Sequence, residues 1–330
     1  MNSFDRPTRI ELLRDCSVGR LGRILGQVFS MRRDGARYSC ALLFTIAGVS
    51  LAAERQLTFD GKGKRDPMFI KEGRELIYSV DTNPYYIQMV SLAMDVKDAK
   101  PDALHEEGTR HQMCMSYSPD ERHIAYLQCT GNLMARLIIR DQEAKKDFAV
   151  SHSGRGGYRA PTFSPDGKRV IYAFAETGPQ QLWSVNLEAK DKKQLTETEG
   201  ISNWPTFTPD GKRIVFANSR ENNYEIYSMD PDGKNEKRLT KNGLMDIRPR
   251  VSPDGKRICF VSTRHGNYEV YVMNIDGTNT RRVTNNDERD DFPSWHPNNR
   301  QLVYVGERRG RRDLYLIDVD PPKIATNAKK

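Results

Sequence analysis

The amino-acid sequence predicts an all-β protein, a six-bladed β-propeller with four antiparallel strands in each blade. Three observations support this prediction. A hairpin motif recurs along most of the chain, each repeat carries four short strand patterns, and no stretch between the repeats has helical periodicity. A ring of four-stranded sheets accommodates repeats of this length without helices. A solenoid of β-strands is the alternative architecture, although its repeats are usually shorter.

The recurring motif is a tight turn with the pattern Ser/Thr-Pro-Asp-Gly, and near-identical copies lie at 163–170, 207–214 and 252–257. Proline presets φ, aspartate can hydrogen-bond its own backbone, and glycine takes a positive φ without steric cost. Degraded copies lie at 117–124 and 295–302. A sixth copy, at 69–76, keeps only the apolar residues that flank the turn and their spacing. The second position of the turn, which is proline in five of the six copies, falls at 71, 119, 165, 209, 253 and 297. The intervals are 48, 46, 44, 44 and 44.

Each repeat has the same order of strand patterns around this turn. A first strand of the form Pro-x-Phe/Trp precedes the turn, and a continuous apolar strand follows it, as in 170–174 and 302–305. The third strand combines aromatic and branched residues, and a short basic strand such as 237–240 ends the repeat. An apolar run suits a strand buried on both faces, and basic residues protect an exposed edge. The first two repeats follow this order less closely than the others.

The two ends of the repeat array complement each other. The last repeat ends after its third strand, at 317–318, whereas the pattern of a fourth strand stands at the opposite end of the array, at 55–58. We therefore expect residues 55–58 to pair with 314–317 and to close the ring as the outer strand of the final blade.

Residues 31–52 have the pattern of a secretory signal peptide. A basic segment at 31–37 precedes an apolar run at 38–51, and small residues predict cleavage after Ala52. The apolar run is shorter than the roughly 20 residues of a membrane span, so an uncleaved signal anchor is the weaker alternative. Export predicts a periplasmic or secreted protein.

These patterns divide the chain into four segments. Residues 1–30 are interpreted as an extension upstream of the true start at Met31, and a basic amphipathic helix on a membrane surface is the alternative. The signal peptide at 31–52 is followed by the propeller at 53–320 and by a polar, flexible tail at 321–330.

The charge pattern does not predict binding to nucleic acid. The formal charge is +8, but residues 1–52 hold eight basic and four acidic residues, which leaves 44 basic and 40 acidic residues over the remainder. Nucleic-acid binding requires positive charge that is clustered on one face. A basic cluster occurs at 308–312, where a solvated hairpin loop is the simpler interpretation and contact with an acidic partner or lipid is the alternative.

The cysteines follow no pattern on which the fold would depend. Cys114, Cys129 and Cys259 lie beyond the predicted cleavage point without CxxC or zinc spacing. Cys259 lies in an apolar run and is expected to be a buried thiol. Cys114 and Cys129 are the two that an oxidising compartment could join.

The repeats resemble the WD40-like propeller repeats of the TolB family. The resemblance rests on Pro-x-Phe/Trp-Ser-Pro-Asp-Gly-Lys-x-Ile, then Ile/Val-Tyr-x-Met, Asp-Gly and Arg-Leu-Thr, and it covers about 54–319. It implies a six-bladed propeller. In TolB this propeller docks the peptidoglycan-associated lipoprotein Pal, and an α/β domain precedes it. Only a few residues separate the predicted cleavage point from the first strand, so we expect that domain to be missing here.

The residues that carry enzyme chemistry in related propellers are not evident. The repeats are also similar to the propeller that caps prolyl oligopeptidase-type peptidases, but the sequence has no Gly-x-Ser-x-Gly elbow. None of the six histidines has His-x-x-x-His or His-Glu-x-x-His spacing. His296 occupies a turn position, where a hairpin cap is the expected role. His111 precedes a first strand and is the weak candidate for a catalytic or metal role.

In a propeller the innermost strand of each blade borders the channel, and its first residues open on one face. These residues differ between repeats although the frame recurs, which is how a rigid scaffold presents a binding surface. We expect Trp204 and Tyr158 to be aromatic anchors, and Arg159 and Arg248 charged ones, because interfaces favour these residue types. The predicted channel mouth comprises Asp66, Tyr158, Arg159, Asn203, Trp204, Asp246, Arg248 and Asp291. The alternative is that these side chains only fill the channel and bind water.

The sequence thus predicts an exported, non-catalytic propeller whose channel mouth binds a cell-envelope protein, such as a Pal-like lipoprotein, or a wall glycan. We expect a monomer without cofactor, metal ion or nucleic-acid partner, in contact with a membrane only through an uncleaved signal segment. The alternative function is an enzyme with a metal ion in the channel, such as a polysaccharide lyase or a lactonase-like propeller.

Overall fold

The computed structural model describes residues 28–33, 36–41, 54–83, 86–104, 110–129, 135–154 and 156–320. The chain divides into two compact units, one of residues 1–50 and 324–330 and the other of residues 51–323. In the first unit, β1 (Val28–Arg33) and β2 (Ala36–Ala41) form an antiparallel hairpin. The predicted extension and signal segment lie partly on this hairpin and partly outside the described residues, as does the whole tail at 321–330, so all three remain predictions. Within the described segments, no helix has the length and hydropathy that crossing a membrane requires.

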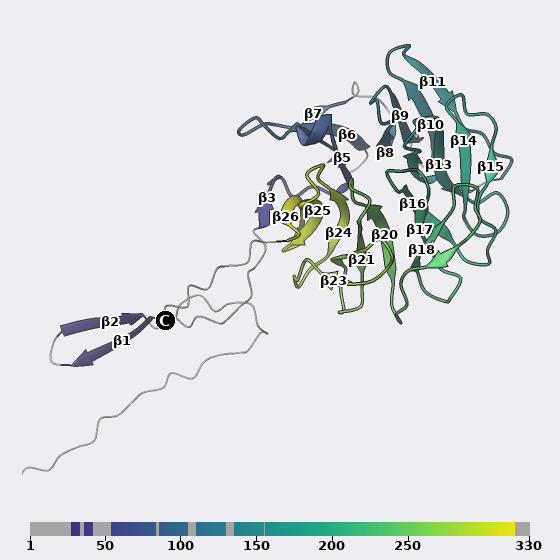
Figure 1. The fold of residues 1–330 in the computed structure, drawn as a ribbon. Helices are drawn as coiled ribbons and strands as arrows, with labels where there is room; N and C mark the ends of the chain where they lie inside the picture. Colours follow the sequence, from purple (N-terminus) through teal and green to yellow (C-terminus); the bar gives the residue numbers. More distant parts are fainter. Residues whose placement is uncertain are drawn as a thin grey trace, which may run out of the picture. The chain divides into compact units, whose positions relative to one another are not determined.

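The second unit is built from six antiparallel sheets of four strands each, which follow one another around the ring in chain order (Figure 1). We number these blades 1 to 6. Blades 1 to 3 consist of β4 (Lys64–Ile70), β5 (Glu75–Asn83), β6 (Tyr86–Ala93) and β7 (Asp102–Ala103); β8 (His111–Tyr117), β9 (His123–Cys129), β10 (Arg136–Asp141) and β11 (Lys146–Ala149); and β12 (Arg159–Phe163), β13 (Arg169–Phe174), β14 (Gln181–Asn186) and β15 (Lys193–Gln194). Blades 4 to 6 consist of β16 (Ser202–Phe207), β17 (Ile214–Asn218), β18 (Glu225–Met229) and β19 (Lys237–Arg238); β20 (Asp246–Val251), β21 (Arg257–Ser262), β22 (Glu269–Asn274) and β23 (Arg281–Arg282); and β24 (Asp290–Trp295), β25 (Gln301–Arg308), β26 (Arg311–Asp318) and β3 (Glu54–Gln56). The predicted fold class is confirmed, and among the described residues the single helical element is the short 3-10 turn η1 (Lys71–Gly73) between β4 and β5.

Strand β3 closes the ring, as the sequence predicted. It pairs antiparallel with β26, and Gln56, Arg55 and Glu54 lie opposite Tyr315, Leu316 and Ile317. The innermost strands also form a closed circuit, because β24 of blade 6 lies beside β4 of blade 1.

A repeated buried hydroxyl explains why this N-terminal strand fits the final blade. In blades 3, 4 and 5, the hydroxyl of a threonine that follows the outer strand accepts a hydrogen bond at 2.9 Å from a backbone N–H of the third strand. In blade 6, Thr58 takes this place and accepts at 2.9 Å from the N–H of Leu314. The Thr58 hydroxyl also donates to Asp313 at 2.9 Å. The equivalent threonines of blades 3, 4 and 5 are Thr196, Thr240 and Thr284.

The second strand of every blade supplies the core between neighbouring sheets. One aromatic residue recurs at the third apolar position of this strand, and each copy is at most 1% exposed. Large buried rings contribute much of the apolar area that stabilises such a core. The six rings belong to Tyr78, Tyr126, Tyr172, Phe216, Phe260 and Tyr304.

The turns after the innermost strands have the predicted chemistry. In blade 4, the Thr208 hydroxyl donates to Asp210 at 2.6 Å, and Gly211 has a φ of +69°. In the degraded copies, Glu121 and Asn299 occupy the glycine position with φ values of 58° and 62°. The turn geometry therefore persists where glycine has been lost, and there the side chain must be held in a strained left-handed conformation.

Candidate functional site

The first half of each innermost strand contains a β-bulge. The register with the second strand shifts in all six blades, and the residue at the shift has a positive φ although it is not glycine. A bulge adds an unpaired residue and turns its side chain away from the regular alternation. Five of the six bulge residues precede proline, which sheets accept at bulges. The six are Asp66, Cys114, Ala160, Trp204, Arg248 and Phe292, with φ values of 50°, 54°, 45°, 51°, 53° and 53°.

The bulges of blades 4, 5 and 6 bring an arginine and two aromatic rings together. The guanidinium carbon of Arg248 lies 5.1 Å from the ring centre of Trp204 and 4.1 Å from that of Phe292. Arg248 also contacts Asp291, with 3.3 Å between Nη1 and Oδ1. Cation–π contacts of this kind strengthen when water is excluded from them. The structure therefore joins the predicted residues Trp204, Arg248 and Asp291 in one cluster and adds Phe292.

Asn203 and Asp291 hold two of these bulges in place. The side-chain oxygen of Asn203 accepts a hydrogen bond from the N–H of Trp204 at 2.8 Å, and that of Asp291 accepts from the N–H of Phe292 at 2.7 Å. Asp291 also accepts from Nε of Arg289 at 2.9 Å and is only 2% exposed. Both side chains thus position their neighbours rather than offer themselves to a partner.

The bulges of blades 1 and 2 form a more polar group. The carboxylate of Asp66 lies beside the thiol of Cys114, and burial, followed by this carboxylate, raises the Cys114 pKa well above its usual value. Burial lowers the pKa of nearby Arg250, and Asp66 opposes that shift. Arg65, next to the bulge, pairs with Asp81 at 2.8 Å. Cys114, Cys129 and Cys259 are all free thiols, and Cys259 is buried as expected.

Tyr158, Asp246 and Arg159 lie differently. Tyr158 is 6% exposed, and its hydroxyl donates to the carbonyl oxygen of Val150 at 2.7 Å. Asp246 is fully buried, binds Arg264 at 2.8 Å, and has its pKa raised by burial. Neither of these two side chains is available to a partner in this structure, whereas Arg159 is exposed.

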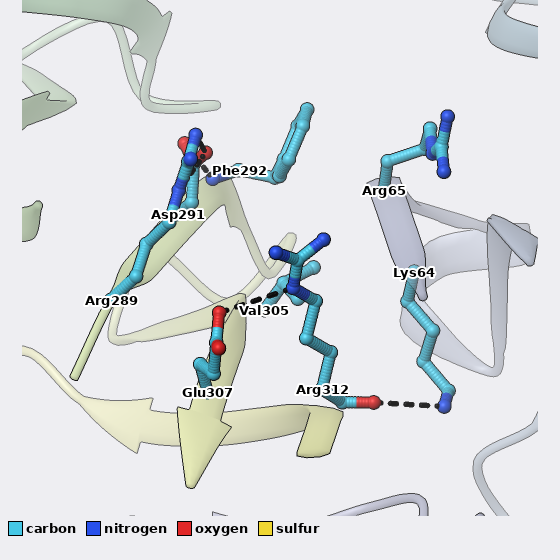
Figure 2. Close-up of a pocket in the computed structure, with 8 residues that line it drawn as sticks. All are labelled: Lys64, Arg65, Arg289, Asp291, Phe292, Val305, Glu307 and Arg312. Carbon is cyan, nitrogen blue, oxygen red and sulfur yellow. Dashed lines mark hydrogen bonds and ion pairs between the residues drawn. The ribbon is translucent and has the colours of Figure 1, made fainter. Parts of the chain in front are cut away.

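A pocket of about 240 Å³ lies between blades 6 and 1, beside the Phe292 bulge (Figure 2). It is lined by Lys64, Arg65, Arg289, Asp291, Phe292, Val305, Glu307 and Arg312. Of these residues, the sequence predicted Asp291 in the channel mouth and Arg312 in a basic cluster for which contact with an acidic partner or lipid was the alternative role. Arg312 belongs to the basic cluster at 308–312, and Lys64 and Arg289 stand just before the bulge positions of their blades, so their charge and place in the repeat were the available signals.

The two histidines singled out from the sequence have structural contacts. His296 accepts a hydrogen bond from the N–H of Asn298 at 3.1 Å, which confirms its predicted role as a hairpin cap. Nδ1 of His111 accepts from the N–H of Ile87 at 3.3 Å. Among the described residues, no three His, Cys, Asp or Glu side chains are grouped so that they could hold a metal ion.

Comparisons with known proteins agree with this architecture. The family model described as the TolB beta propeller domain matches residues 86–323. A search of curated proteins found no match. Among solved structures, TolB from Acinetobacter baumannii is 23% identical and gives a TM-score of 0.62, over 76% of this chain and 65% of that protein. The chain therefore spans just under two thirds of that TolB.

Two structures of enzymes show the same fold at lower identity. Oligogalacturonate lyase in complex with manganese is 14% identical with a TM-score of 0.60, over 90% of this chain and 97% of that chain. A gluconolactonase from Xanthomonas campestris is 11% identical with a TM-score of 0.62, over 82% and 90% of the two chains. At these identities the likeness establishes a shared fold alone, because one propeller scaffold hosts unrelated functions. The family model covers most of the closed six-bladed ring, and the chain therefore belongs to the TolB β-propeller domain family.

Proposed function

We propose that the protein is an exported, non-catalytic propeller that binds a cell-envelope protein through the bulge residues at the start of its innermost strands. The observation that carries this proposal is the Trp204–Arg248–Phe292 stack. It gathers two aromatic rings and a guanidinium from three successive blades at one end of the innermost strands. Tryptophan and arginine are over-represented among the residues that dominate binding energy at protein interfaces.

The contrast between bulge residues and frame supports a binding role for the bulges. Turns, buried rings and threonine contacts recur from blade to blade, whereas the six bulge residues are all of different types. A rigid frame that presents a varied set of side chains is typical of a recognition surface. Export, and with it an envelope partner, rests on the signal pattern at 31–52.

The proposal is tested by capture of envelope proteins on the immobilised full chain. Trp204→Ala and Arg248→Ala should each abolish capture of a protein that the parent chain retains. Lys212→Ala is the matched control, because Lys212 is exposed on the turn at the other end of the innermost strand of blade 4. Circular dichroism should show that all variants remain folded. A further variant, Arg248→Lys, keeps the positive charge and removes the planar guanidinium that stacks on the two rings.

Two outcomes would count against the proposal. Capture of the same protein by both alanine variants with undiminished affinity would remove the stack from the interface. A metal ion bound tightly and stoichiometrically to the purified protein would instead favour the alternative of a channel-metal enzyme.

A further inference from the structure

The pocket between blades 6 and 1 is rich in arginine. Its walls come from β4, from β25 and β26, and from the start of β24, and Figure 2 shows Arg312 reaching between the strand of Glu307 and the strand of Lys64 and Arg65. Phe292 shares the pocket, so the pocket is continuous with the aromatic stack described above.

Two of its guanidinium groups have N–H donors that are not engaged in hydrogen bonds. Nη2 of Arg65 binds Asp81 at 2.8 Å, and Nε of Arg312 binds Glu307 at 3.1 Å. The remaining side-chain nitrogens of these two arginines have no hydrogen-bond partner within the described part of the chain. The Arg65 side chain is 29% exposed and that of Arg312 is 50% exposed, so both can meet a ligand.

The other charged groups of the pocket are largely engaged, although Nη1 of Arg289 has no hydrogen-bond partner within the described residues. The Lys64 side chain is fully buried, and its ammonium donates to the carbonyl oxygen of Arg312 at 3.1 Å and to Asp313 at 3.3 Å. Asp291 is bound by Arg289 and Arg248. An incoming group therefore meets the free nitrogens of Arg65 and Arg312, with Nη1 of Arg289 and the carboxylate of Glu307 beside them.

Equivalent junctions show that these basic residues are not part of the repeated frame. Between blades 5 and 6, the N–H of Asp290 donates to the carbonyl oxygen of Tyr268 at 2.8 Å. Asp290 there takes the place of Lys64, and Tyr268 takes that of Arg312. The same bond joins Asp246 and Tyr224 at 2.8 Å between blades 4 and 5. At these two junctions, acidic and aromatic side chains thus stand where the closing junction carries two cations, and between blades 3 and 4 the same bond joins the uncharged Ser202 and Gln180.

We propose that the pocket receives the carboxylate of a single acidic side chain, Asp or Glu, presented by the protein partner. This inference rests on the proposed function. Guanidinium groups form strong, directional hydrogen bonds to carboxylates, and the Phe292 ring can pack against the aliphatic part of the incoming side chain. The pocket volume of about 240 Å³ is below the roughly 300–1,000 Å³ of sites that enclose a whole small molecule. A volume of this size can admit the end of one side chain.

The test uses the full chain and two synthetic peptides, acetyl-Gly-Gly-Glu-Gly-Gly-amide and its Gln counterpart, titrated at low salt and followed by NMR. The Glu peptide should bind and shift the signals of Arg65 and Phe292, and the Gln peptide should bind at least about tenfold more weakly. Arg65→Gln and Arg312→Gln should each raise the Kd for the Glu peptide about tenfold. Arg74→Gln should change it less than about twofold, because Arg74 is exposed on the turn at the other end of β4.

The folding of the variants and the source of the carboxylate are controlled separately. Arg312→Lys keeps the charge without the planar fork and should bind with intermediate affinity if the geometry matters. Equal binding of the Glu and Gln peptides, or unchanged binding by folded Arg65→Gln and Arg312→Gln, would overturn the inference. Galacturonate binding to the same arginines more tightly than the Glu peptide would also overturn it, in favour of a glycan acid.

Failure of this inference can be told apart from failure of the proposed function. If the peptides do not bind while Trp204→Ala still abolishes capture of an envelope protein, only the acidic-anchor inference fails. If the Glu peptide binds through Arg65 and Arg312 while Trp204→Ala leaves capture unchanged, the pocket stands and the role of the stack in partner binding fails.

Discussion

Replacement of Thr58 by valine tests directly whether the N-terminal strand is an integral part of blade 6. Valine keeps the shape of threonine and removes the hydroxyl. The hydroxyl donates to Asp313 at 2.9 Å and accepts from the N–H of Leu314 at 2.9 Å, and Thr58 is 7% exposed. The variant therefore loses one bond to a charged acceptor and leaves a buried N–H without its side-chain partner.

The expected cost follows from these two losses. A hydrogen bond to a charged group contributes about 1.5–3 kcal/mol, and an unsatisfied buried donor costs about 1–3 kcal/mol. Asp313 still accepts hydrogen bonds from the N–H of Gly61 at 3.2 Å and from the ammonium of Lys64 at 3.3 Å. These two bonds reduce the free-energy cost of losing the Thr58 hydroxyl. We expect Thr58→Val to lower the free energy of unfolding by about 2–4 kcal/mol. With a urea dependence of about 3 kcal/mol per molar, the unfolding midpoint would fall by about 1 M.

The matched control is Thr240→Val in blade 4, which is covalently continuous. Thr240 accepts from the N–H of Ile226 at 2.9 Å and donates to Glu225 at 2.6 Å, so it makes the same pair of contacts. Urea unfolding of both variants, followed by circular dichroism, should give similar losses. A cost below about 0.5 kcal/mol for Thr58→Val, beside a full cost for Thr240→Val, would refute the reasoning, because the hydroxyl contacts of the closing strand would then contribute nothing to stability.

Two further predictions concern other blades. The Ser153 hydroxyl is the first of several donors that lower the pKa of Glu176 from its ordinary 4.5 to about 2. The stabilisation from Glu176 is therefore complete above about pH 4.5 and is lost as the pH falls towards 2, so Glu176→Gln should be about 1 kcal/mol less stable at pH 7 and should approach the parent in acid unfolding curves. A Cβ atom at Gly233, where φ is +90°, would collide with the carbonyl oxygen of Leu195, and urea unfolding should show that Gly233→Ala costs about 2 kcal/mol or more. Gly178→Ala, at a φ of +74° with open space around it, should cost only about 1 kcal/mol, and equal costs for the two would contradict the steric argument.

The fold could be predicted from the sequence because its local signals agree with one another. The turn motif contains the residues that its geometry requires, and Gly211 has the expected positive φ. The apolar second strands are buried on both faces, and residues 55–58 carry the threonine that the last blade needs. Each of these signals is local, and their repetition specified the number of blades and the closure.

The details of the candidate site could not be predicted in the same way. The bulge at each innermost strand adds one residue and changes which side chains face the blade interior. Asp246 and Tyr158 lie two residues before their bulges and are buried, whereas the bulge residues Trp204 and Arg248 are partly exposed. The bulge residues include no glycine, and the proline that follows five of the six is the one sequence signal of the register shift. The pocket between blades 6 and 1 depends on residues about 250 positions apart, such as Lys64 and Arg312.

The closing strand also constrains the order in which the molecule can be completed. The contact between Thr58 and Asp313 spans 255 positions, so the first strand of the ring has to wait for the last one. Until then blade 6 has an open edge, and the incomplete chain carries unpaired backbone groups that other chains can join. Bringing together segments so distant in the chain is entropically costly, which makes closure a late and slow step. The protein is consequently most vulnerable to proteolysis and aggregation before β26 has paired with β3.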